Sequence, residues 1–333
     1  MKKHSIRCVL FNGLGGAGQR HLRIFRKLLP KSRFVCARSL GKTPVLNSDF
    51  SIKQNTNLSN EYNLEIFNNI EDAYSTNPDI SVIATPSSNH FNDCKQALKY
   101  NSNIFVEKPG PISRNQIIML KKTLLRKNKN FFISYQRRFH PLVRKLKKLI
   151  ENNSIGKINL VRIQTSSYVP DWHPYENFYD LYAVRKNLGG GVVNTEIHEI
   201  DLLNWFFGKP KKIYSIIAKR SNFKINVEDQ ADILVDYKKF TAIINLSFMK
   251  KIQKRYIIIE GDKGEIKLDF ISQNLTTINN DLKKKTYFMP CDNERLFYLQ
   301  NKYYLNNLYK IENIYLDYAL LNANFIEKIK YID

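Results

Sequence analysis

The sequence predicts an α/β N-terminal domain with a doubly wound parallel sheet, followed by an α+β domain with a largely antiparallel open sheet. In the first 135 residues, short apolar runs alternate with helical segments, which is typical of a doubly wound sheet. From residue 136 on, strand-like runs follow one another with few helices between them, which favours antiparallel pairing. We therefore expect two domains, 1–135 and 136–333, and 333 residues suffice for both.

The elements of the first domain follow from apolar runs separated by breakers. Strands are expected at Ile6–Phe11, Phe34–Ala37, Leu64–Phe67, Asp79–Thr85, Asn103–Glu107 and Phe131–Tyr135. Helices are expected at Gly18–Leu29, near Glu71–Ser75, at His90–Tyr100 and at Ser113–Lys127. Pro30 ends the first helix, because a proline cannot continue the hydrogen-bond ladder. The polar stretch 41–62 is expected to be irregular.

The second domain is expected to start with a basic amphipathic helix, Leu142–Glu151, and to contain one further helix, Val192–Phe207. Its expected strands are Ile158–Tyr168, Lys211–Lys219, Ala231–Tyr237, Thr241–Met249, Tyr256–Glu260 and Glu265–Phe270. The last forty residues are expected to be helical. One face of this sheet must be covered by the helix, by the first domain or by another subunit. An exposed face would favour a homo-oligomer, a dimer or tetramer, and this is the expected assembly.

Composition excludes several classes of protein. The formal net charge is +23, but the lysines are spread over the chain and no nucleic-acid module is visible, so we expect no nucleic-acid partner. No apolar run reaches about 18 residues, which predicts no membrane span. The basic start Met1-Lys2-Lys3-His4 leads straight into the first strand, so we expect this segment to belong to that strand and not to a signal peptide. The four cysteines form no C-x-x-C pair, which favours reduced thiols in a cytoplasmic protein without a metal site.

A glycine-rich turn separates the first strand from the first helix. Residues 9–20 read V-L-F-N-G-L-G-G-A-G-Q-R, with Gly13, Gly15 and Gly18 in a G-x-G-x-x-G pattern around Gly16 and Ala17. In this context the pattern is the dinucleotide-binding fingerprint, in which amides at the helix start hold a pyrophosphate. The alternative is an ordinary glycine-rich turn.

The end of the second expected strand bears on the choice of cofactor. An acidic residue there binds the ribose hydroxyls of NAD, whereas an arginine accommodates the 2′-phosphate of NADP. This chain has Arg38, followed by Ser39. The sequence therefore favours NADP, with NAD and a merely surface-exposed arginine as the alternatives.

Two later strand ends carry further candidates. Thr85, Pro86, Asn89 and His90 follow the most apolar strand and are assigned to the cofactor, although His90 more often packs near the next helix than takes part in catalysis. Glu107 and Lys108 follow the next strand. An ammonium group at that position can bind a substrate hydroxyl and stabilise a developing alkoxide. By spacing alone, Lys108 could also be a surface lysine.

A triple glycine precedes the helix expected in the second domain. On that helix Asn194, His198 and Asp201 fall at i, i+4 and i+7, hence on one face. A polar stripe centred on a histidine suits a general base. A core histidine bonded to a helix neighbour is the alternative.

In order and spacing these segments resemble the glucose–fructose oxidoreductase / inositol dehydrogenase (Gfo/Idh/MocA) family, over about residues 5–300. The tripeptide Glu107-Lys108-Pro109 carries the resemblance most specifically, together with Tyr135–Pro141, the G-G-G…H-x-x-D stretch, Glu228–Ala231 and Ile259–Gly264. The resemblance implies that Lys108 is the catalytic lysine and that His198 transfers the proton. It also implies that the segment containing Arg138 lines the active site.

The run Tyr168–Pro174 is similar to a subgroup associated with bacterial surface sugars, in which Trp172 and His173 could contact a sugar; loop packing is equally compatible. The residues assigned to the substrate are Arg138, Trp172, His173, Asn194, Thr195 and Asp201. Many family members have an aspartate four residues before the histidine, where this chain has Asn194. The segment after about Tyr287 looks short and divergent.

These observations support an NAD(P)-dependent oxidoreductase acting on a CH–OH group of a sugar or nucleotide sugar, in a pathway such as surface-polysaccharide synthesis. The alternative is a catalytically inactive protein of the same fold that binds cofactor and senses a sugar. Asn194 and the divergent C-terminal segment motivate that alternative.

Overall fold

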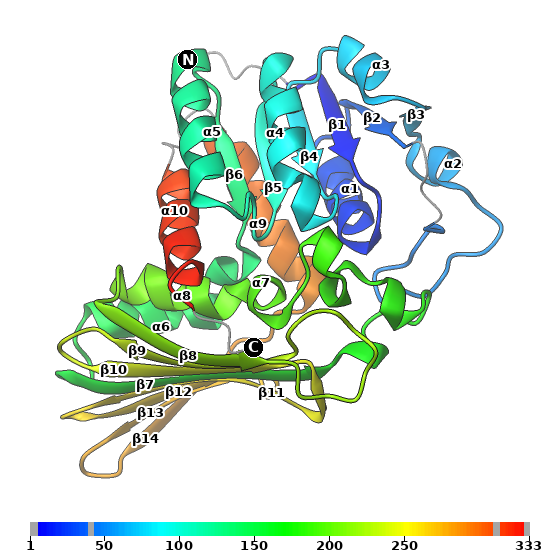
Figure 1. Ribbon diagram of the computed structural model, residues 1–333. Coiled ribbons are helices and arrows are strands. Elements are labelled where there is room, and N and C mark those ends of the chain that lie inside the picture. Colours follow the sequence, from blue (N-terminus) through cyan, green and yellow to red (C-terminus); the bar gives the residue numbers. More distant parts are fainter. Residues whose placement is uncertain (1–5, 39–42, 309–313, 330–333) are drawn as a thin grey trace. The chain divides into compact units, whose positions relative to one another are not determined.

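The structure, a computed structural model, describes residues 6–38, 43–308 and 314–329 (Figure 1). The chain forms two compact units. The first comprises Met1–Ser134, His173–Glu176 and Phe297–Leu320, and the second comprises Tyr135–Trp172, Asn177–Leu296 and Leu321–Asp333. The division therefore differs from a single boundary near residue 135, because two later segments belong to the first unit.

A six-stranded parallel sheet forms the centre of the first unit, in the order β3-β2-β1-β4-β5-β6. Its strands are β1 Cys8–Asn12, β2 Arg33–Ala37, β3 Glu65–Phe67, β4 Ile80–Ile83, β5 Asn103–Glu107 and β6 Phe131–Ser134. All residues of β4, β5 and β6 are buried, as expected of strands covered on both faces. The predicted doubly wound sheet is confirmed.

Helices cover both faces of this sheet (Figure 1). They are α1 Gly16–Leu28, α2 Leu58–Tyr62, α3 Ile70–Ser75, α4 His90–Lys99 and α5 Arg114–Lys127. The short helix α2 lies in the stretch that was expected to be irregular, and Asn57 caps it by accepting a hydrogen bond from the Asn60 amide.

The C-terminal helices α9 (Asn293–Asn307) and α10 (Ile314–Ile326) contribute to the core of the first unit. The Tyr304 ring of α9 lies 5.1 Å from Phe105 of β5 and 5.2 Å from Phe132 of β6, between ring centroids. Tyr315 of α10 lies 4.2 Å from Phe132. Helices α9 and α10 therefore cover part of one face of the parallel sheet, over β5 and β6.

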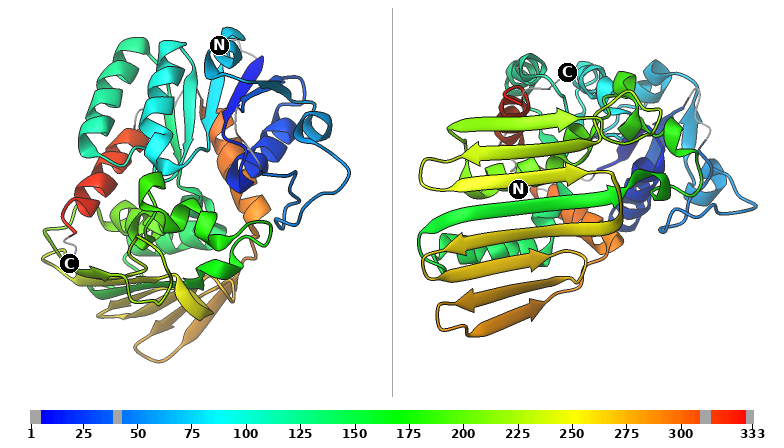
Figure 2. Two further views of the ribbon diagram at one scale, coloured as in Figure 1. Left: turned by 45° about the vertical axis from the view of Figure 1, so that its right-hand side comes forward. Right: turned by 60° about the horizontal axis from the view of Figure 1, so that its bottom comes forward.

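An eight-stranded sheet forms the second unit, in the order β14-β13-β12-β11-β7-β10-β9-β8 (Figure 2). Its strands are β7 Ile158–Tyr168, β8 Lys212–Ala218, β9 Gln230–Asp236, β10 Thr241–Ser247, β11 Met249–Gly261, β12 Gly264–Asp269, β13 Asn274–Asn279 and β14 Lys284–Phe288. Neighbouring strands are antiparallel except β7 and β10, which are parallel. The largely antiparallel sheet is confirmed.

Helix α6 (Pro141–Glu151) packs against β12 and β13, and α7 (Val192–Thr195) packs against β9 and β10. A third helix, α8 (Ile197–Phe207), is almost entirely buried over its first eight residues. Short 3₁₀ turns occupy Gln136–Phe139, Val169–Asp171, Phe178–Asp180, Tyr182–Val184 and Lys186–Leu188.

Two expectations for the second unit are wrong. The single helix over Val192–Phe207 is two helices, broken at Glu196, whose backbone has φ −95° and ψ 33°. The Glu196 carboxylate binds Arg255 of β11, and this pairing over 59 residues anchors the break. Strand β13 and the edge strand β14 were not expected, because their Asn, Thr and Lys residues carry little apolar alternation.

Among the described residues, no helix combines the length and apolarity that crossing a membrane would require. All four cysteines are buried as free thiols.

Candidate active site

One edge of the first sheet collects the segments singled out from the sequence. Because β1, β2, β4 and β5 are parallel neighbours, their carboxyl ends lie at the same edge. The glycine turn follows β1, Arg38 follows β2, Thr85–His90 follow β4, and Lys108 follows β5. Ser39 lies outside the described residues.

Two glycines of the turn are required by the protein's own packing. Gly13 has φ +93°, and a Cβ there would lie 2.6 Å from the Ala84 carbonyl oxygen. A Cβ on Gly18 would lie 2.2 Å from the Gly13 carbonyl oxygen. A side chain at Gly13 would force the turn away from the end of β4, and a side chain at Gly18 would force α1 away from the turn.

Gly15 has no such structural reason. It caps α1 with φ −70°, and a Cβ there would meet nothing within 4 Å. The open space lies at the N-terminus of α1, which has no acidic residue in its first turn and presents the amides of Gly16 and Ala17. These features fit a dinucleotide pyrophosphate, whose approach to the backbone a side chain would block.

Substitutions of Gly15 and Gly18 should therefore affect different properties, dinucleotide binding and stability respectively. We expect Gly15→Ala to weaken dinucleotide binding about tenfold or more while leaving the melting temperature within about 2 °C, because only the ligand needs that space. Gly18→Ala should lower the free energy of unfolding by about 1–3 kcal/mol through overpacking. Calorimetric titration and thermal unfolding of both variants check this; equal effects on melting temperature would contradict it.

Arg38 is held at the end of β2. One guanidinium nitrogen donates to the Thr43 carbonyl oxygen at 2.8 Å, and the Arg38 amide donates to Phe67 at 2.9 Å. Burial lowers the pKa of Arg38 somewhat, with an opposing effect from Cys36. The guanidinium remains cationic at neutral pH, since the ordinary value lies far above it.

His90 ties two strand ends together. Its ring is buried, with Nε2 2.9 Å from the Thr85 carbonyl oxygen and Nδ1 3.1 Å from that of Gly110. Burial lowers the pKa of His90, against the opposing effect of the hydrogen bonds to Gly110 and Thr85. Thr85 is further fixed by donating to Asp93 at 2.5 Å. Pro86 and Asn89 flank the short 3₁₀ turn between Thr85 and His90.

Glu107 lies at the centre of a buried polar network that the sequence did not reveal. Its Oε1 accepts from His21 Nε2 and from Ser134 Oγ, both at 2.7 Å. Two residues of α9 complete the network, since Asn301 donates to His21 Nδ1 and Gln300 donates to Ser134 Oγ, each at 3.0 Å. The sequence signal was a pair of adjacent polar residues, Gln300 and Asn301, which lie three or four positions after Phe297 and before Tyr304, as on one face of a helix.

This network keeps Glu107 charged beside Lys108. Burial raises the pKa of Glu107, but the His21 hydrogen bond, the Lys108 charge and Ser134 outweigh it, so the pKa falls below its ordinary value. The Lys108 amide lies 3.2 Å from Glu107 Oε2, and the Lys108–Pro109 peptide is cis. The backbone of the lysine is therefore held by the Glu107 carboxylate.

The second unit contains His198 in the first turn of α8, where it is buried. Asn194 belongs to α7, so the expected stripe of Asn194, His198 and Asp201 on one helix is wrong. The Asn194 amide group lies 3.4 Å from the carbonyl oxygens of both Gly189 and Gly190, and Thr195 is buried beside it.

Arg138 and Asp201 form a buried ion pair. Arg138 Nε and NH2 donate to the two Asp201 oxygens at 2.8 and 2.6 Å, and the side chains are 5% and 0% exposed. Asn322 of α10 donates to Asp201 at 2.9 Å. Since both Asp201 oxygens accept hydrogen bonds in this cluster, the cluster holds α8 in place.

Trp172 and His173 fall in different units. The Trp172 ring packs edge-on against Phe248 at 5.5 Å, and His173 Nδ1 lies 2.7 Å from Glu176 Oε1. Each therefore has a packing partner within the protein.

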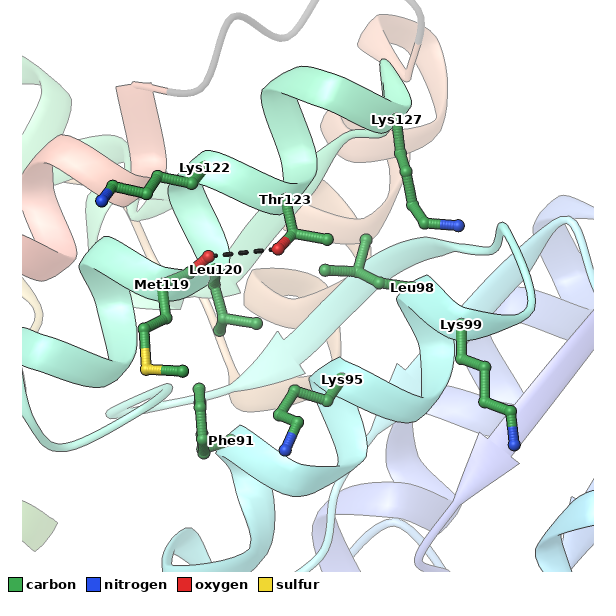
Figure 3. Close-up of a pocket in the computed structure, with 9 residues that line it drawn as sticks. All are labelled: Phe91, Lys95, Leu98, Lys99, Met119, Leu120, Lys122, Thr123 and Lys127. Atoms are coloured by element: carbon green, nitrogen blue, oxygen red, sulfur yellow. Dashed lines mark hydrogen bonds between the residues drawn. The ribbon is translucent and has the colours of Figure 1, made fainter.

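A groove of about 420 Å³ lies between α4 and α5 (Figure 3). Its lining contains none of the candidate site residues and consists of Phe91, Lys95, Leu98, Lys99, Met119, Leu120, Lys122, Thr123 and Lys127. Within the described chain, no group of three or more His, Cys, Asp or Glu side chains is arranged to hold a metal ion.

Two family descriptions match the chain. "Oxidoreductase family, NAD-binding Rossmann fold" matches residues 6–135, and "GFO/IDH/MocA C-terminal domain" matches residues 143–267. Oxidoreductase P35 of Formosa agariphila is 24% identical over 212 residues, covering 62% of this chain and 64% of that protein. The chain thus matches less than two thirds of that relative's length.

Solved structures show the same fold. An oxidoreductase from Agrobacterium radiobacter, in complex with NAD⁺, L-tartaric acid and magnesium, has a TM-score of 0.79 and 17% identity over 97% of this chain and 94% of that one. UDP-N-acetylglucosamine 3-dehydrogenase of Acidithiobacillus ferrooxidans has a TM-score of 0.74 and 13% identity, covering 97% of both chains.

Proposed function

The chain belongs to the GFO/IDH/MocA oxidoreductase family, with an NAD-binding Rossmann domain, and from this premise we propose that it transfers hydride between a nicotinamide dinucleotide and a CH–OH carbon of a sugar or nucleotide sugar. One observation carries the proposal. Lys108 stands at the sheet edge that bears the glycine turn, fixed by a buried and charged Glu107.

The chain's own residues supply proton handling and orientation. The dinucleotide, when bound, supplies the hydride acceptor or donor. In the oxidation direction, Lys108 binds the substrate oxygen and stabilises the negative charge that develops on it. His198 accepts the hydroxyl proton, and in reduction it returns the proton.

The substrate class rests on the family and on a neighbour that shares the fold. The dehydrogenase of Acidithiobacillus ferrooxidans is named for a nucleotide sugar, and a sugar used to build surface polysaccharides suits the motif Tyr168–Pro174. A screen of free and nucleotide-activated sugars tests the proposal, with turnover measured by the absorbance of the reduced cofactor. Turnover of at least one sugar supports it, and turnover of acyclic alcohols alone would contradict it.

A non-catalytic sugar sensor is the second candidate, and Asn194 favours it. This side chain binds glycine carbonyl oxygens through its amide group, whereas an aspartate would place a negative charge against them. This hypothesis predicts that the dinucleotide affinity changes when a sugar is added, and that no sugar is oxidised or reduced.

Arg38 is the proposed determinant of an NADP preference. We expect Arg38→Ala to weaken NADPH binding about tenfold or more with little change for NADH, because only NADPH carries the 2′-phosphate that a guanidinium binds. Parallel fluorescence titrations with both dinucleotides measure this. Equal losses for the two would assign Arg38 a structural role at the end of β2.

The second sheet offers a surface for homo-oligomerisation. Tyr214, Leu234 and Ile243 pair in one row across β8, β9 and β10, and are 55%, 46% and 40% exposed. Figure 2 shows this face of the sheet without a covering helix among the described residues. An apolar row of this kind is typical of an interface.

We therefore propose that two copies of the chain associate through this row. Leu234→Glu should shift the molar mass in light scattering from oligomer to monomer, since it buries a charge in the interface. Thr286→Glu, in the same cross-strand row at the opposite edge, is the control and should leave the mass unchanged. A monomeric wild type, or an unshifted L234E, would contradict the interface.

A further inference from the structure

Four residues of the first unit, His173–Glu176, have chain neighbours on both sides that belong to the second unit. We call them the strap. The His173 and Tyr175 rings stack on each other at 5.2 Å, and their centroids lie 5.1 and 6.1 Å from that of Phe50. The strap therefore packs on the loop that leads from β2 to α2.

Phe50 connects the strap to the first turn of α1. A Cβ on Gly16 would lie 2.7 Å from the Phe50 ring and 3.2 Å from the Tyr175 hydroxyl. The Arg20 guanidinium lies 4.5 Å from the Phe50 ring centroid, as a cation–π contact. The Tyr175 hydroxyl is thus held beside the helix start that carries the glycine turn.

The hydrogen bonds of Tyr175 define what its hydroxyl can do. The hydroxyl accepts a hydrogen bond from the Gly16 amide, shares a second one with Glu176, and lies 3.2 Å from His173 Nδ1. Glu176 also lies 2.7 Å from His173 Nδ1. Burial raises the pKa of Tyr175, and the Glu176 carboxylate raises it further, so the hydroxyl stays protonated and its one hydrogen serves Glu176.

The Gly16 amide is also one of the donors that a dinucleotide pyrophosphate needs. It is the first N–H of α1, without a partner inside the helix, and the helix dipole favours an anion there. The neutral Tyr175 hydroxyl oxygen accepts from this amide at the place where a phosphate oxygen would accept. The same amide cannot serve the strap and a phosphate oxygen at full strength.

We propose that the strap competes with the cofactor pyrophosphate for the Gly16 amide, so that Tyr175 and Glu176 set the affinity and exchange rate of the dinucleotide. The inference rests on the proposed function, in that the glycine turn binds the dinucleotide. A closed strap lowers the apparent affinity by the fraction of molecules in which it is closed.

A direct bond from Tyr175 to the phosphate would have the opposite effect. In that case removing the hydroxyl would weaken binding. The structure favours competition, because the hydroxyl hydrogen is directed to Glu176, and because a carboxylate next to the phosphates would repel them.

Tyr175→Phe removes only the hydroxyl and keeps the ring stack. It should tighten binding of NADH and NADPH about two- to tenfold, mainly through faster association, which corresponds to one net hydrogen bond. Glu176→Gln should act in the same direction. Tyr179→Phe, an exposed tyrosine of the following segment, is the matched control and should change nothing. Stopped-flow fluorescence gives both rate constants.

Hydrogen exchange of the Gly16 amide tests the strap without any cofactor. Tyr175→Phe should speed this exchange severalfold, and Tyr179→Phe should not. Weaker or unchanged dinucleotide binding in Y175F overturns the competition. If neither dinucleotide binds the wild type, the proposed function fails, and unchanged exchange in Y175F would separately overturn the strap contact.

Discussion

Lys108→Met is expected to reduce turnover by a factor of about 10²–10⁴ while leaving dinucleotide affinity within about threefold. Methionine keeps the length of the side chain and removes the ammonium group that would stabilise a developing alkoxide. The contact between the Lys108 amide and Glu107 Oε2 does not involve the side chain that is replaced, so the backbone here should keep its position. Steady-state kinetics on the best sugar of the screen and a dinucleotide titration measure the two quantities.

Lys95→Met is the matched control, because Lys95 is an exposed lysine of the same unit that lines the groove between α4 and α5. It should retain full turnover. A K108M variant as active as K95M would remove Lys108 from the mechanism. Loss of dinucleotide binding together with turnover would show instead that the lysine holds the cofactor.

Breaking the Arg138–Asp201 pair is expected to cost about 3–5 kcal/mol of unfolding free energy, because Asp201→Ala leaves a buried guanidinium without its counter-charge. In a unit of this size, that loss corresponds to a fall of roughly 10 °C in melting temperature. The double variant Arg138→Met/Asp201→Leu should recover part of the loss, since it removes both charges. Denaturant unfolding of the wild type and of these two variants measures both differences.

The exposed pair Arg162–Glu260 in the same unit is the control, with side chains 45% and 36% exposed. Glu260→Gln should cost no more than about 1 kcal/mol, since solvent screens such pairs. If Asp201→Ala is as mild as this control and raises KM for the sugar, the sequence assignment of Asp201 to the substrate is correct and the structural role is wrong.

Local sequence patterns were enough to predict the parallel strands of the first unit. Its strands are short, apolar and bounded by glycine, proline or polar residues, and each carries its own signal. The G-x-G-x-x-G pattern and Glu107-Lys108-Pro109 are also local, so their places at strand ends follow once the parallel sheet is predicted. Even so, the sequence did not show that Gly13 and Gly18 serve packing whereas Gly15 faces open space.

What could not be predicted depends on contacts between distant residues. Arg138 and Asp201 lie 63 positions apart, and as isolated polar residues near a histidine they were assigned to the substrate. The helix break at Glu196 depends on Arg255 in the same way. His21 and Asn301 are 280 positions apart, and only the folded chain shows that they share a hydrogen bond behind Glu107.

The return of α9 to the first unit has a consequence for biosynthesis. Asn301, Gln300 and Tyr304 complete the surroundings of Glu107 and Phe105, yet Gln300 follows its partner Ser134 by 166 positions. During translation the parallel sheet therefore lacks these contacts until all strands of the second sheet have been made. A fragment ending near residue 135 would also lack them, and the dependence of this unit on chaperones should be greatest before α9 is made.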